Sequence, residues 1–90
     1  MPTIDIRRKH HRTIKEAKAA VDKVAKAIGK EFQLEYGWEG NTLIFERSGV
    51  NGSIAVSKDE LHVHVKLGLL LGMLKPTIEK EIEKHLDKHL

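Results

Sequence analysis

The chain has 90 residues, of which 32% are charged and 40% are hydrophobic, and 16 basic and 13 acidic side chains give it a formal net charge of +3. This length supports one modest core, so we predict a single domain over residues 1–90. The absence of cysteine excludes disulfides, thiol catalysis and thiolate metal sites. No apolar signal segment follows Met1, so we expect the protein to stay in the cytoplasm.

The first third of the chain predicts a strand followed by an amphipathic helix. Over residues 3–9, Ile4 and Ile6 alternate with polar side chains, which is the period of a strand. Thr13 and Glu16 have the spacing of a capping box, in which each side chain accepts a hydrogen bond from the other residue's backbone N–H. The helix that follows has one apolar stripe, formed by Ile14, Ala17, Val21, Val24, Ile28 and Phe32.

The segment from Arg7 to Arg12 is the one basic cluster of the sequence. Such a cluster can contact phosphates, but nucleic-acid binding usually adds aromatic side chains among the basic ones, and this segment has none. We therefore interpret it as a solvated strand end and loop, and we expect no nucleic-acid partner.

The middle of the chain predicts antiparallel hairpins. Apolar residues alternate with polar ones from Leu34 to Trp38, and a turn over residues 39–41 leads into a second strand. Asn51-Gly52 is the strongest hairpin signal, because both residue types tolerate positive φ. A two-residue turn there pairs Val50 with Ser53, and by the same register it aligns four apolar residues on one face: Leu43, Phe45, Ile54 and Val56.

The last third predicts one more strand and a second helix. Apolar residues alternate with His62, His64 and Lys66 up to Leu67, which gives the sheet one dry and one wet face. Pro76 suits the first turn of a helix, whose apolar line is formed by Leu74, Ile78, Ile82, Leu86 and Leu90. We predict an α+β fold of two layers in the order β-α-β-β-β-β-α, with two helices on one face of a four- to five-stranded antiparallel sheet.

Between this strand and helix, the run from Leu67 to Leu74 contains no polar side chain. A bilayer span needs about 20 apolar residues, so the run predicts no membrane span. It is either core, where a strand end becomes the first turn of a buried helix, or an exposed contact surface. The second interpretation makes five residues the candidate contacts for a partner, a homodimer or an apolar surface: Leu69, Leu70, Leu71, Met73 and Leu74.

Six histidines raise the question of a metal site. Two groups have suitable spacing: His62 and His64 with Glu60, and His85 and His89 with Glu81. Neither group has the sequence context of a known site, so we predict no metal and no cofactor. No serine lies in a nucleophile elbow, and the glycines follow no phosphate-loop spacing. We therefore expect no catalytic residues and no enzyme activity.

The aromatic side chains suggest an alternative function. A curved antiparallel sheet under a long helix can enclose a small-molecule pocket for a hydroxyacyl or lipid-like ligand. Tyr36, Trp38 and Phe45 are the candidate lining residues of such a pocket. The competing interpretation of Trp38 is a core ring with its N–H at the rim.

Five segments in order resemble a known family: Thr3-Ile4-Asp5-Ile6-Arg7-Arg8, Trp38-Glu39-Gly40-Asn41-Thr42-Leu43, Arg47-Ser48-Gly49-Val50-Asn51-Gly52, Leu67-Gly68 with Leu70-Leu71-Gly72, and Ile78-Glu79-x-Glu81-Ile82. By these segments the chain resembles the polyhydroxyalkanoic acid system family, small bacterial proteins encoded beside genes for the synthesis of polyester storage granules. The family offers no catalytic residue to carry over.

The resemblance implies a non-catalytic accessory protein of the polyhydroxyalkanoate system, cytoplasmic and with the storage granules as its candidate location. Its expected partner is the surface of the granule, which is an apolar polyester with a protein coat, or a granule protein. Granule coat proteins tend to be long amphipathic helices, whereas this chain predicts a well-specified sheet, which favours a folded binding module.

Overall fold

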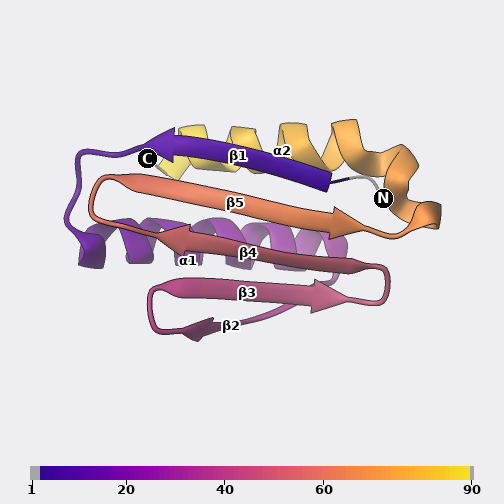
Figure 1. Cartoon of the computed structure of the whole chain (residues 1–90), viewed down its shortest axis with the longest axis horizontal. Coiled ribbons are helices and arrows are strands. Elements are labelled where there is room, and N and C mark those ends of the chain that lie inside the picture. Colours follow the sequence, from indigo (N-terminus) through magenta and orange to yellow (C-terminus); the bar gives the residue numbers. More distant parts are fainter. Residues whose placement is uncertain (1–2, 90) are drawn as a thin grey trace.

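The computed structural model describes residues 3–89, and of Leu69 and Leu70 it describes the backbone alone. Five antiparallel strands form one sheet in the order β1-β5-β4-β3-β2, and both long helices lie behind the same face of it (Figure 1). The strands are β1 (Thr3–Lys9), β2 (Glu35–Glu39), β3 (Thr42–Arg47), β4 (Val50–Val56) and β5 (Glu60–Leu67). The helices are α1 (Ile14–Phe32), the short 3-10 helix η1 (Leu69–Leu74) and α2 (Lys75–His89). The predicted fold class and element order are confirmed.

The capping box at the start of α1 is present as predicted. The Glu16 backbone N–H donates to the Thr13 hydroxyl at 3.1 Å, and the Thr13 N–H donates to the Glu16 carboxylate, also at 3.1 Å. The backbone and hydroxyl hydrogen bonds from Thr13 lower the pKa of Glu16. Because folding lowers this pKa, the cap stabilises the helix above the pKa of Glu16 in the unfolded chain and weakens as the pH falls.

The core lies between the inner face of the sheet and the two helices. The predicted stripe of α1 is buried from Ala17 to Ile28, with Ile14 and Phe32 half-buried at its ends. In α2 the buried positions are Ile78, Ile82 and Leu86, whereas Leu90 lies outside the described residues. The strands contribute Ile4, Ile6, Leu43, Phe45, Val50, Ile54, Val56, Leu61, Val63, Val65 and Leu67.

The predicted turn at Asn51-Gly52 is wrong. The chain turns at Ser48-Gly49, where Gly49 has a φ of 86°, and Arg47 pairs with Val50. Gly52 instead lies in β4 opposite Phe45. A Cβ on Gly52 would come within 2.4 Å of the Phe45 ring, so this glycine leaves room for a cross-strand aromatic.

The register error leaves the predicted inner face intact. For each β3 residue, the observed partner and the partner expected from the predicted turn differ by an even number of positions. Because side chains alternate with a period of two, an even shift leaves every side chain on the same face. Leu43, Phe45, Ile54 and Val56 therefore still share the buried face.

We predict that Gly52→Ala destabilises the protein by about 1–3 kcal/mol, because the added methyl overpacks the site under the Phe45 ring. Gly37→Ala in β2 is the matched control, since a Cβ there meets nothing within 4 Å. That variant should stay within about 0.5 kcal/mol of the wild type. Urea unfolding measures both changes, and equal midpoints for the two variants would contradict the packing role of Gly52.

We also predict that Thr13→Ala lowers the free energy of unfolding by about 1 kcal/mol, because it removes the hydroxyl that caps α1. Thr13→Ser keeps an acceptor at the same position and should retain most of the stability. Thermal unfolding followed by circular dichroism compares the two. A Thr13→Ala protein as stable as Thr13→Ser would show that the cap hydrogen bond is unimportant.

Candidate functional site

The apolar run after β5 forms a tight turn at one end of the sheet. Leu67 is buried as the last residue of β5, which confirms that it ends the inward alternation. The Gly68 N–H donates to the Gly49 carbonyl at 2.8 Å, and the Leu71 N–H donates to the Gly68 carbonyl at 3.0 Å. The β3–β4 turn thus fixes the start of η1.

The predicted contact residues in this run divide into inner and outer ones. Leu71 is half-buried and packs against the core, and its Cδ1 would lie 3.1 Å from a Cβ on Gly49. Met73 is 88% exposed and Leu74 is 42% exposed. Leu74 is therefore not a buried start of the α2 stripe, because the 3-10 turn leaves it at the surface. The side chains of Leu69 and Leu70 lie outside the described residues.

We call the exposed part of this turn, Met73 and Leu74, the apolar end. Lys66 precedes the run and Lys75 follows it, and no charged residue lies between them in the sequence. Hydrophobic side chains that stay exposed beside a formed core lower the free energy when a partner covers them. The apolar end can therefore act as a contact surface.

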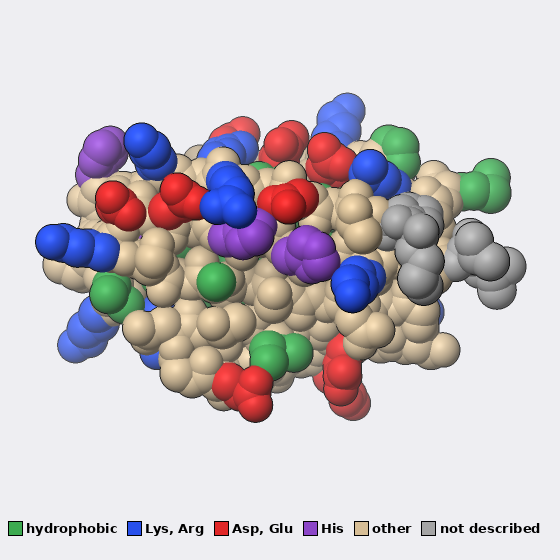
Figure 2. Space-filling view, in the orientation of Figure 1, with side chains coloured by type: hydrophobic (Ala, Val, Ile, Leu, Met, Phe, Trp, Pro, Cys, Tyr) green, Lys and Arg blue, Asp and Glu red, His purple; other side chains and the backbone are tan. Residues whose placement is uncertain are grey.

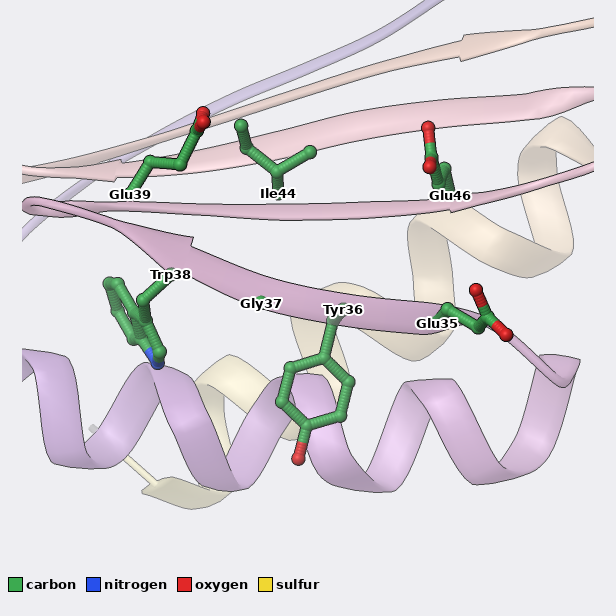
Figure 3. A pocket seen from close by; sticks show the side chains of 7 residues that line it. All are labelled: Glu35, Tyr36, Gly37, Trp38, Glu39, Ile44 and Glu46. Atoms are coloured by element: carbon green, nitrogen blue, oxygen red, sulfur yellow. The ribbon is translucent and has the colours of Figure 1, made fainter.

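The three aromatic residues predicted to line a pocket do not lie around one cavity. Phe45 is buried in the core at 6% exposure. Tyr36 and Trp38 point toward α1 from the edge strand β2, whereas Ile44 and its acidic neighbours project from the opposite face (Figure 3). A concavity at this edge contains Tyr36 and Trp38 together with Glu35, Gly37, Glu39, Ile44 and Glu46, and it does not include Phe45.

Trp38 attaches the edge strand to the helix. Its indole N–H donates to the Asp22 carboxylate at 3.0 Å, and the Lys18 ammonium lies 4.9 Å from the ring centroid. Both partners belong to α1. This arrangement matches a half-buried ring with its N–H at the rim, which is a structural use of the residue.

The two histidine groups have different surroundings. In the sheet, a ring nitrogen of His62 lies 2.7 Å from the Asp5 carboxylate on the neighbouring strand. Between the helices, His85 Nε2 lies 3.6 Å from Glu31 and 3.9 Å from Glu81, and the three ligand atoms lie within 4.8 Å of one another. Sequence reasoning named Glu81 but missed Glu31, because Glu31 comes from α1.

The second group is a polar contact between the two helices. His85 Nδ1 is buried and, among residues 3–89, has no hydrogen-bond partner. A metal on Nε2 would leave the ring proton on this unpartnered nitrogen, whereas metal-bound histidines normally donate that proton to a neighbour. The Glu31 contact joins α2 to α1, although 3.6 Å is longer than a hydrogen bond.

None of the helices within residues 3–89 combines the length and the apolar content that a membrane span requires.

No curated protein and no solved structure matches the chain. The family model of the polyhydroxyalkanoic acid system proteins (PHA_gran_rgn) matches residues 4–90, which include the whole sheet, except for Thr3, and all helices. The chain therefore belongs to the polyhydroxyalkanoic acid system protein family.

Proposed function

We propose that the protein is a non-catalytic accessory protein of the polyhydroxyalkanoate storage system, and that it binds a granule component through its apolar end. Family membership supports the link to the storage system. The observation that carries the proposed site is the 88% exposure of Met73, beside the half-exposed Leu74, in a segment without charge. A polyester granule offers an apolar surface of matching chemistry.

The two long helices are poorly suited to coat a granule themselves. A helix that coats an apolar surface needs a free apolar face. In this protein the apolar stripes of α1 and α2 are buried against the sheet and against each other. Among the described side chains, Met73 and Leu74 are the two most exposed large hydrophobic ones, so the apolar end is the better candidate contact.

The apolar end is small, and this limits the strength of one contact. Fully burying one large aliphatic side chain contributes about 1.5–3 kcal/mol. Two such side chains give a weak, reversible attachment for a single copy of the protein. We expect an accessory protein that exchanges on and off the granule.

We predict that Met73→Asp combined with Leu74→Asp abolishes co-sedimentation with isolated polyhydroxyalkanoate granules. Each aspartate would have to lose its hydration against an apolar partner, which costs more than the lost leucine or methionine contact alone. Granules stripped of their proteins form a second arm of the experiment. Binding that survives stripping identifies the polymer as the partner, and binding that is lost identifies a granule protein.

Thr77→Asp is the matched control, because it adds one acidic side chain to an exposed position one turn further along α2. We expect this control to bind like the wild type, and circular dichroism should show all variants folded. A folded double variant that still binds like the wild type would refute the apolar end as the site. Equal loss of binding in Thr77→Asp would refute a specifically apolar contact.

A further inference from the structure

One face of the sheet is left without a covering layer. Both long helices lie behind the other face, and Figure 2 views the open face in the orientation of Figure 1. Strand register assigns its outward side chains to three rows across the sheet. From β1 to β2 the rows are Thr3-Lys66-Asn51-Glu46-Glu35, Asp5-His64-Ser53-Ile44-Gly37 and Arg7-His62-Ala55-Thr42-Glu39.

The centre of the open face is formed by small and uncharged side chains. The middle strand β4 contributes Asn51, Ser53 and Ala55, and β3 adds Thr42 and Ile44, which is 36% exposed. In Figure 2 this region is mostly tan and green, with the charged side chains around it. A second flat surface can approach β4 closely, because the outward side chains of this strand are short.

The charges on the two sides of this centre differ. The β2–β3 side presents three exposed, outward-facing carboxylates, those of Glu35, Glu39 and Glu46. These two strands have no outward-facing lysine or arginine. Within the described part of the chain, none of these carboxylates lies in an ion pair.

The β1–β5 side has an excess of bases. Its two outward-facing acids already have partners within the subunit. Asp5 lies 2.7 Å from His62, and Glu60 lies 3.2 Å from Arg7. Lys66 is exposed and, among residues 3–89, forms no ion pair. One half of the face therefore has free carboxylates, and the other half has a free ammonium group.

We propose that the open face binds a second copy of this chain. The two-fold axis of this dimer is parallel to β4 and lies between the two facing sheets. Such an axis keeps each residue's position along the strands and exchanges the two sides of β4. β5 of one copy then lies over β3 of the other, and β1 lies over β2. Within the first row Lys66 faces Glu46 of the second copy, and within the third row Arg7 faces Glu39 of the second copy.

The Lys66–Glu46 contact is the more robust of these two. Stacked sheets lie about 10 Å apart, a gap that a lysine and a glutamate can bridge together. Packed sheets are rotated by about 30° relative to each other because of their twist, and this rotation displaces a contact in proportion to its distance from the centre of the interface. Lys66 and Glu46 are both one strand from β4, whereas Arg7 and Glu39 are both two strands away.

The size of the face fits a reversible dimer. Strands about 4.8 Å apart make a five-stranded face about 20 Å wide. With side chains, two such faces would bury on the order of 1,000 Å² in total, which is the lower end of specific interfaces. We expect monomer and dimer to exchange, with the dimer favoured at low salt because its charge pairs are partly exposed.

This dimer would place both copies of the apolar end at the same end of the assembly, because the axis preserves position along the strands. Two weak contacts on one granule would then act together, and the second would form at a high effective concentration. This consequence depends on the proposed function, but the dimer itself does not.

The test uses charge reversal and analytical ultracentrifugation of the full chain without granules. The wild type should dimerise at low salt, and Lys66→Glu or Glu46→Lys should each weaken the dimer about tenfold or more, since each creates two like-charge contacts. An equimolar mixture of the two variants should dimerise again. In the mixed dimer, Glu at position 66 faces Lys at position 46, and the other contact is the wild-type pair.

The matched controls are Lys80→Glu and Glu83→Lys, on the exposed side of α2. We expect each control variant to dimerise like the wild type. Circular dichroism checks that all variants fold. A wild type that stays monomeric at its highest soluble concentration would overturn the proposal. So would variants that dimerise normally, or a mixture that stays monomeric, since no effect inside one subunit predicts restoration on mixing.

Discussion

The contact of the Phe45 ring with the backbone of Gly52 is the constraint on which most of this structure depends. It pairs two residues at the middle of β3 and β4, and a Cβ at position 52 would come within 2.4 Å of the ring. The contact therefore selects one register for the hairpin. Since β5 pairs with β4 and β1 with β5, the same register determines which side chains share a row across the whole sheet.

The fold then assigns a different environment to each face. The inner face receives the apolar strand residues and both helices, and the capping box starts α1 at the residue that brings its stripe over the sheet. The outer face receives His62, His64, small polar residues and charges. Two helices supply one covering layer, so in a single copy the second face stays in contact with water.

The apolar end is a consequence of the same geometry. The carbonyl of Gly49 in the β3–β4 turn accepts a hydrogen bond from Gly68, which fixes where β5 stops and η1 begins. The 3-10 turn then points Met73 away from the core. The proposed granule contact and the proposed dimer therefore lie on separate surfaces that one hairpin holds in place.

Much of this fold could be predicted from the sequence because it depends on local periodicity. The capping box at Thr13, the stripe of α1 and the inward residues of β5 follow from spacing alone. The β3–β4 turn could not be predicted in this way. Asn51-Gly52 has the composition of a hairpin turn, but Gly52 serves a ring on another strand, and that contact appears only when the strands pair.

The candidate sites were less predictable for the same reason. The sequence identified the apolar run, but the exposure of Met73 and Leu74 depends on a 3-10 turn that the helical spacing of Leu74 and Ile78 does not reveal. The proximity of Glu31 to His85 requires the packing of α1 on α2. The charge rows of the open face require the strand order, in which β1 pairs with β5.

The most direct test of this account is the proton NMR spectrum of the β3–β4 hairpin in the wild-type protein. The account predicts that an α-proton of Gly52 is shifted upfield by the Phe45 ring current, with nuclear Overhauser effects from that ring to Gly52. It also predicts cross-strand nuclear Overhauser effects between Arg47 and Val50. An unshifted Gly52 α-proton, with Val50 paired to Ser53 across an Asn51-Gly52 turn, would contradict the register on which the proposed surfaces depend.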